Sequence, residues 1–114
     1  MITVEKLNSF GANTTEGLTR CFGNEALYLK LVATIPGDAV FEKLKQNLEA
    51  KNLDGAFEAA HALKGVLGNL SLTPLYETAI EITELLRKHT DMDYSELLAK
   101  LLEKKEELGK LCNE

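Results

Sequence analysis

The sequence predicts an all-α protein, an up-and-down antiparallel four-helix bundle with short accessory N-terminal helices. Glycine and proline are sparse, at 8 and 2 in 114 residues, and no β-branched run shows the strict alternation typical of strands. Apolar residues recur instead at the spacing of a helix face through most of the chain. The breaks between these segments are only a few residues long, which makes consecutive helices antiparallel neighbours.

Two short helices are expected at the N-terminal end, over residues 3–8 and 14–22. Asn13 precedes the second one, with Glu16 three residues on, which is the spacing of a capped helix start. Asn24 caps a third helix, and Pro36-Gly37 ends it. The apolar stripe of this third helix consists of Leu27, Leu31 and Ile35.

The middle of the chain predicts three further helices. Asp38 begins the first, and its stripe consists of Phe41, Leu44 and Leu48. A turn at Lys51-Asn52 leads to a long helix over residues 53–70. Thr73-Pro74 begins the third, with a hydroxyl cap followed by proline at the first helical position. Its inner stripe consists of Leu75, Ala79, Ile82 and Leu86.

The last helix follows a loop at residues 89–92 and is opened by Asp93 with Glu96 three residues on. Its inward-facing residues are Leu97, Leu101, Leu108 and Leu111. The chain has no repeat, linker or low-complexity tract, so residues 1–114 are expected to form a single domain.

Charge and hydropathy exclude several classes of protein. Thirteen Lys and Arg against eighteen Asp and Glu give a net charge of −5, which argues against a non-specific nucleic-acid binder. No apolar run approaches the roughly 20 residues that cross a bilayer, and the first residues lack the basic-then-apolar form of a signal peptide. We therefore expect a cytoplasmic protein. The Met1 start favours a stand-alone protein over a piece of a hybrid sensor kinase.

Cysteines and histidines give no sign of a metal site. Cys21 and Cys112 lie far apart, and two reduced, partly buried thiols are expected rather than a disulfide. The only histidines, His61 and His89, share no zinc-ligand spacing with either cysteine. A Gly-rich phosphate loop and a cluster of histidines with carboxylates are both missing, which excludes nucleotide-binding and di-iron bundle proteins.

The helix over residues 53–70 has two unlike faces when drawn at about 100° per residue. One is an ordinary core face, made of Ala56, Ala59, Leu63, Val66, Leu67 and Leu70. The opposite, exposed face is made of Asp54, Phe57, Glu58, His61, Lys64, Gly65 and Gly68.

The two glycines on the exposed face indicate a function. Each glycine in a helix interior costs about 1 kcal/mol relative to alanine, yet Gly65 and Gly68 follow His61 at i+4 and i+7. They remove side chains beside the imidazole, so another backbone or a bulky anion can approach. Phe57, at i−4, adds an aromatic side chain that we expect to contribute to docking.

Lys64 strengthens this interpretation because it lies at i+3 from His61, where Cβ atoms are about 5–6 Å apart. An ammonium at that distance favours the neutral, nucleophilic imidazole and can neutralise a phosphoryl group on a ring nitrogen. The combination of this histidine with the lysine and the two glycines favours a functional site over the simpler interpretation of an ordinary surface histidine.

These residues carry a family resemblance. The run Ala60-His61-Ala62-Leu63-Lys64-Gly65, followed by Gly68-Asn69-Leu70, resembles the signature of histidine-containing phosphotransfer (HPt) domains of two-component phosphorelays. Glu16-Gly17-Leu18 and Phe22-Gly23-Asn24-Glu25 precede it at the usual distance. The resemblance implies a four-helix bundle with accessory N-terminal helices, a phosphorylatable His61, Lys64 beside the phosphate, and Gly65 as the residue that leaves room.

The chain departs from the family pattern at three positions. Ser71 stands where the family usually has glycine, and Val66-Leu67 replace small residues. The wheel directs both Val66 and Leu67 inward, so we expect changed packing and a changed helix end rather than lost chemistry.

The resemblance implies a phosphocarrier rather than an enzyme. His61 would take a phosphoryl group from a receiver-domain aspartate, through Nε2, and return it to another. The protein would have no cofactor of its own, with Mg²⁺ supplied by the receiver. Its partners would be response-regulator receivers and a hybrid sensor histidine kinase, with the carrier itself a monomer. The alternative is a phosphate-independent scaffold or inhibitor that binds a receiver or a sensor kinase.

Other charged groups are assigned more ordinary roles. A carboxylate at Glu77, Glu81 or Glu84 could orient His61 through its other nitrogen, and the sequence does not choose among them. His89 is expected at a helix C-terminus, where the dipole favours partial positive charge.

Overall fold

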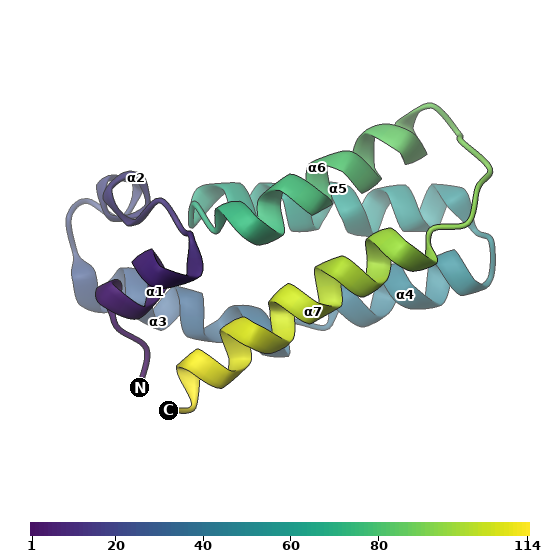
Figure 1. Ribbon diagram of the computed structural model, residues 1–114. Helices are drawn as coiled ribbons and strands as arrows, with labels where there is room; N and C mark the ends of the chain where they lie inside the picture. The colour runs from purple at the N-terminus through teal and green to yellow at the C-terminus, as the bar shows by residue number, and fades with distance from the viewer.

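The computed structural model describes residues 1–114 as a chain of helices joined by short turns (Figure 1). The helices are α1 (Val4–Phe10), α2 (Thr14–Arg20), α3 (Glu25–Thr34), the 3₁₀ turn η1 (Ile35–Gly37), α4 (Val40–Glu49), α5 (Leu53–Asn69), α6 (Thr73–Arg87) and α7 (Ser95–Cys112). The prediction of an all-α fold with short N-terminal helices is confirmed.

The helices form an elongated bundle of 40 × 25 × 20 Å. Helices α4 to α7 extend along its length, while α1, α2 and the start of α3 gather at one end, where both termini also lie (Figure 1). Helix α5 packs against α4 on one side and α6 on the other, and α6 in turn packs against α7. Helix α5 therefore has a buried arc between two neighbours and an exposed arc away from them.

Asparagine side chains fix where several helices begin. Those of Asn13, Asn24 and Asn52 each accept a hydrogen bond from the backbone N–H three residues later, which satisfies a donor that has no partner within the helix. The caps predicted at Asn13 and Asn24 are confirmed. The Asn52 cap fixes the start of α5, the helix that carries His61.

Three predicted helix starts differ in detail. Helix α4 begins at Val40, two residues after the expected Asp38, whose carboxylate accepts a hydrogen bond from the backbone N–H of Val40. Thr73 is the first residue of α6 rather than its cap, and its hydroxyl donates to the carbonyl of Ser71 at 3.4 Å. Helix α7 begins at Ser95, two residues after the expected Asp93. Asp93 still serves this helix start, since its carboxylate accepts hydrogen bonds from the backbone N–H and the hydroxyl of Ser95.

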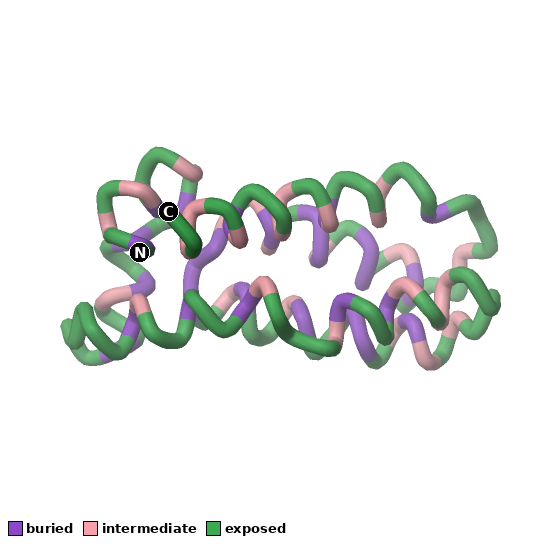
Figure 2. Tube along the Cα trace, turned by 90° about the horizontal axis from the view of Figure 1, so that it is seen from below, coloured by how far each residue is buried: buried purple, intermediate pink, exposed green.

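The core is one continuous apolar cluster between the helices, and the buried positions in Figure 2 turn toward its axis. The predicted stripe of α6 is fully confirmed, since all four of its residues are at most 1% exposed. Phe41 and Leu44 of α4 are buried, as are Leu101 and Leu108 of α7. The other predicted members, Leu48, Leu97 and Leu111, are partly buried at its edge.

The stripe predicted for α3 was wrong at two of its three positions, and only Ile35 is buried as predicted. Leu27 and Leu31 are 38% and 39% exposed, whereas Tyr28 and Val32 are completely buried. The cause is Tyr28, which lies against Gly17 of α2, where a Cβ atom would fall 2.5 Å from the tyrosine ring. Its hydroxyl donates to the carbonyl of Leu70 at 2.8 Å. The aromatic ring rather than the leucines therefore sets the rotation of α3.

Val66 is also misplaced by the wheel, since it is 38% exposed instead of lying in the core. The buried arc of α5 is shifted toward Ala60, which is completely buried although it was not predicted to be. Leu67 is buried as predicted. Val66 and Ala60 lie at opposite edges of the arc, so a rotation of a few tens of degrees exposes one and buries the other.

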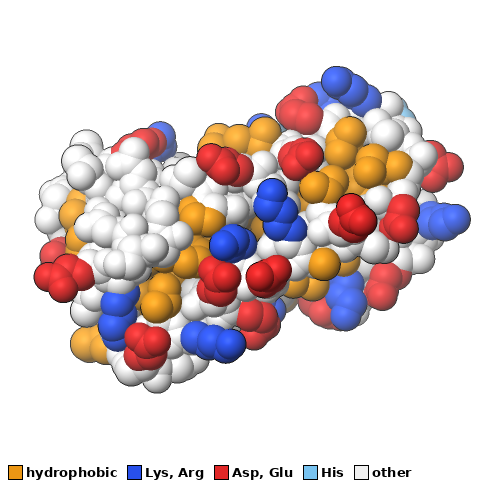
Figure 3. Space-filling model, viewed as in Figure 1, with side chains coloured by type: hydrophobic (Ala, Val, Ile, Leu, Met, Phe, Trp, Pro, Cys, Tyr) orange, Lys and Arg blue, Asp and Glu red, His pale blue; other side chains and the backbone are white.

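Surface charge and thiols agree with the sequence. Acidic and basic side chains are interspersed over the face in Figure 3, with no continuous basic patch there. Both cysteines are free, Cys21 buried and Cys112 partly buried, and no disulfide joins them. No helix combines the length and the apolar character needed to cross a membrane.

Candidate functional site

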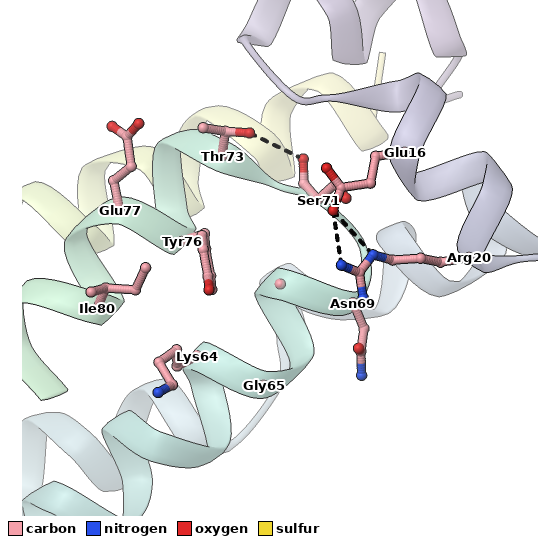
Figure 4. A pocket seen from close by; sticks show the side chains of 11 residues that line it. Glu16, Arg20, Lys64, Gly65, Asn69, Ser71, Thr73, Tyr76, Glu77 and Ile80 are labelled. Atoms are coloured by element: carbon pink, nitrogen blue, oxygen red, sulfur yellow. Dashed lines mark hydrogen bonds and ion pairs between the residues drawn. The ribbon is translucent and has the colours of Figure 1, made fainter.

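His61 lies near the middle of α5, on the face turned away from α4 and α6, and is exposed. Lys64, one turn further along, is half-buried, and Gly65 beside it is exposed. Figure 4 shows Lys64 and Gly65 on α5, with Tyr76 and Ile80 of α6 across from them. The helix predicted from the sequence thus presents the histidine, the lysine and the first glycine on one accessible face.

The two glycines after His61 have different surroundings. A Cβ atom built on Gly65 would meet nothing within 4 Å. A Cβ atom on Gly68 would lie 3.0 Å from Cε1 of Tyr76. Gly65 therefore leaves open space beside the imidazole, as expected. Gly68 instead allows the ring of Tyr76 to lie on α5, and it is half-buried rather than open.

Phe57 lies against His61 within α5. Their ring centroids are 5.7 Å apart and the ring planes differ by 15°, so the rings are stacked. The guanidinium carbon of Arg87, from the last turn of α6, lies 5.1 Å from the Phe57 centroid. Arg87 in turn pairs with Glu84 through its Nε, at 3.4 Å. The sequence gives no sign of Arg87 at this site, because only the packing of α6 on α5 brings it here.

A pocket of about 490 Å³ adjoins Lys64 on the α6 side (Figure 4). It is bounded by the C-terminal half of α5, the start of α6 and one face of α2. Its lining residues are Glu16, Arg20, Lys64, Gly65, Gly68, Asn69, Ser71, Thr73, Tyr76, Glu77 and Ile80. Arg20 contributes a second cation, and it is paired with Glu16 at 2.9 Å. Helix α2 thus forms part of the surface beside the candidate site, which the sequence did not indicate.

The three glutamates considered as partners of His61 lie in different settings. Glu84 is ion-paired with Arg87. Glu77 lines the pocket together with Lys64. Glu81 is exposed on α6. The geometry therefore gives the imidazole an aromatic neighbour, Phe57, rather than a carboxylate.

The second histidine, His89, follows the C-terminus of α6 as expected, where its φ of 56° ends the helix. It borders a second pocket of about 510 Å³ with Phe57 and Arg87. His89 has neither a lysine at i+3 nor glycines beside it. No group of three or more His, Cys, Asp or Glu side chains is arranged to hold a metal ion.

Residues 37–113 match the family model of the Hpt domain. This range holds α4 to α7 and includes His61, Lys64 and Gly65, while α1, α2 and α3 precede it. No curated protein and no solved structure matches the chain.

Proposed function

The chain belongs to the Hpt domain family, the histidine phosphotransfer modules of two-component systems, and from this we propose that His61 receives a phosphoryl group from a receiver-domain aspartate and passes it to another. Hpt domains are phosphocarriers rather than enzymes, and they interact with receiver domains. The upstream donor would be the receiver of a hybrid sensor kinase and the acceptor a response regulator.

One observation carries the assignment to His61. Its imidazole is exposed, an ammonium lies one helical turn away, and the next position toward the helix C-terminus has open space where a side chain would be. A phosphoryl group on a ring nitrogen needs this combination, because it must be reached by a partner and its negative charge must be balanced. His89 lacks both features.

The proposed transfer is a direct displacement at phosphorus. In the neutral imidazole the proton stays on Nδ1, and the lone pair on Nε2 forms the N–P bond. The P–O bond to the receiver's aspartate breaks at the same time, and the aspartate leaves as a carboxylate. The ammonium of Lys64 offsets charge on the equatorial phosphoryl oxygens, and Mg²⁺ held by the receiver supplies the other positive charge.

The second candidate is a module that binds a receiver or a kinase without taking phosphate. It would use the same surface and differ only in whether His61 becomes phosphorylated. The intact set of His61, Lys64 and Gly65 favours the carrier, since a binding surface alone does not require a nucleophile with an adjacent cation and open space.

Intact-mass measurement distinguishes the two candidates. The protein is incubated with receiver domains that have been phosphorylated with acetyl phosphate, and we expect the mass of one phosphoryl group to appear on it, labile in acid and stable in base. His61→Gln should abolish the gain and His89→Gln should retain it. Phosphate still gained by the His61 variant would reject the assignment, and receiver binding without any gain would support the phosphate-independent module.

A further inference from the structure

The stack of Phe57 on His61 restricts how the imidazole can turn. An exposed histidine ordinarily samples several rotamers about χ1 and a broad range about χ2. Here the ring planes differ by only 15° at a centroid separation of 5.7 Å, an arrangement that rotation about χ2 would break. Offset aromatic stacking is favourable enough to populate one orientation several-fold over the others.

Phe57 is itself held from the neighbouring helix. Its ring is half-buried against the core, and the Arg87 guanidinium carbon lies 5.1 Å from its centroid. Such a cation–π contact is attractive even at an exposed site. Arg87 also forms an ion pair with Glu84 through its Nε, at 3.4 Å. A continuous set of contacts thus runs from α6 through Phe57 to the imidazole.

We propose that Phe57 and Arg87 are positioning residues, which hold the imidazole of His61 in the orientation needed for in-line attack on phosphorus. This inference rests on the proposed function of His61, since it assigns a role within that transfer. It also changes the role expected for Phe57 from docking to positioning, because the ring is engaged by His61 and Arg87 within the chain. Nε2 attacks productively only when its lone pair lies along the breaking P–O bond.

Positioning and docking have different kinetic effects. A residue that orients the imidazole changes the maximal transfer rate at saturating phosphorylated receiver. A residue that contacts the receiver changes the concentration giving half of that rate. Releasing the imidazole into the three staggered χ1 wells should lower the maximal rate about threefold to tenfold and leave the half-saturating concentration within twofold.

The test compares substitutions that keep or remove the planar ring. Phe57→Leu keeps an apolar side chain but loses the stack, whereas Phe57→Tyr keeps the ring. Single-turnover transfer from a phosphorylated receiver gives the two kinetic constants. The NMR shifts of the His61 ring protons report the stack in the unphosphorylated protein. We expect Phe57→Leu to lower the maximal rate and remove the ring-current shift, and Phe57→Tyr to restore both.

Arg87→Gln provides a variant with no risk to the core, since Arg87 is exposed. It should reduce the ring-current shift of the His61 ring protons and lower the maximal rate, as Phe57→Leu does but by a smaller factor. Lys104→Gln is the matched control, because it removes another exposed ion pair of i,i+3 spacing, on α7. This control should change neither quantity.

The outcomes separate this inference from the function on which it rests. Failure of the wild-type protein to take phosphate would contradict the proposed function, whatever the ring shifts show. Wild-type transfer with an unchanged maximal rate in Phe57→Leu would overturn the positioning role. A rise in the half-saturating concentration alone would overturn it in favour of docking.

Discussion

At the scale of single residues, Lys64 separates function from stability. Its side chain is half-buried and forms none of the ion pairs of the structure, so its removal should change the melting temperature little. We expect Lys64→Ala to slow transfer or shorten the lifetime of the phosphohistidine, because in the proposed transfer its ammonium would balance phosphoryl charge. Transfer rates, phosphate hydrolysis rates and thermal melts measure the three effects, with Lys64→Arg as the charge-preserving control. A large loss of stability with normal transfer would contradict this.

Substitutions of Gly65 should increase stability and slow phosphoryl transfer. An added Cβ atom meets nothing within 4 Å, so Gly65→Ala should stabilise the protein by about 0.4–1 kcal/mol through helix propensity and lower unfolded-state entropy. The same methyl group narrows the space beside the imidazole, and transfer should slow. Gly65→Leu should block transfer almost completely. Denaturant midpoints and transfer rates test this pair of effects, and normal transfer in the leucine variant would refute it.

Gly68 is the matched control for the stability half of this argument. Its added Cβ atom would lie 3.0 Å from the Tyr76 ring, so Gly68→Ala should gain less stability than Gly65→Ala or lose some. The sequence alone places both glycines on the exposed face and predicts the same gain for each. The difference comes from α6, which no spacing within α5 reveals.

Ser71 shows how a departure from a family pattern becomes understandable in the structure. Its φ of 53° lies in the left-handed region, which costs a non-glycine residue roughly 1–2 kcal/mol. Its hydroxyl is buried without a hydrogen-bond partner. Glycine at this position would avoid both costs. The expectation of a changed helix end at Ser71 could be stated from the sequence, but its backbone conformation could not.

At the scale of helices, apolar periodicity predicts the buried face correctly where a helix has a single apolar stripe. It fails where a helix has two competing stripes. Helix α6 has a single apolar stripe, and all of it is buried. In α3, the pair Leu27 and Leu31 competes with the pair Tyr28 and Val32, and both have i,i+4 spacing. Which of the two pairs is buried depends on the contacts of Tyr28 with Gly17 and Leu70, which lie outside α3.

The anchoring of α3 by Tyr28 can be tested through pH. Burial raises the pKa of the Tyr28 hydroxyl to about 12, with a smaller contribution from Cys21. The folded state thus holds this proton more tightly than the unfolded chain, whose tyrosine pKa is about 10. Its stabilising contribution is fully present below about pH 10 and is lost as pH rises toward 12. Equilibrium unfolding of wild type should show this loss, and Tyr28→Phe should show a smaller one. Equal pH dependence in both proteins would contradict the assignment.

At the scale of the whole molecule, the candidate site divides into what one helix specifies and what packing adds. His61, Lys64, Gly65 and Phe57 all lie on α5, so helical spacing alone could place them on one face. Arg87 reaches Phe57 from α6, and Arg20 reaches the pocket from α2. Contacts between helices depend on rotation and tilt, which a single sequence does not specify.

The position of α2 leads to a prediction about receiver binding. This helix precedes the range that matches the Hpt domain, yet Arg20 shares a pocket with Lys64 and Gly65 (Figure 4). A partner that brings a phosphoryl group to His61 would come close to this surface, and we expect Arg20, although paired with Glu16, to contribute to the attraction of that partner. The ion pair of Arg20 with Glu16 is exposed, so its loss should change stability by less than about 1 kcal/mol.

Arg20→Glu should therefore weaken receiver binding without affecting the chemistry. We expect the half-saturating concentration of phosphorylated receiver to rise about threefold to tenfold, with the maximal rate within twofold of wild type. Because charges at a rim act mainly on association and are screened by salt, the effect should shrink between low and high ionic strength. Single-turnover transfer at two salt concentrations measures this, with Lys104→Gln on α7 as the control for loss of a surface cation. A fall in the maximal rate, or an effect independent of salt, would show that α2 acts through the structure of the site and not through the charge it presents.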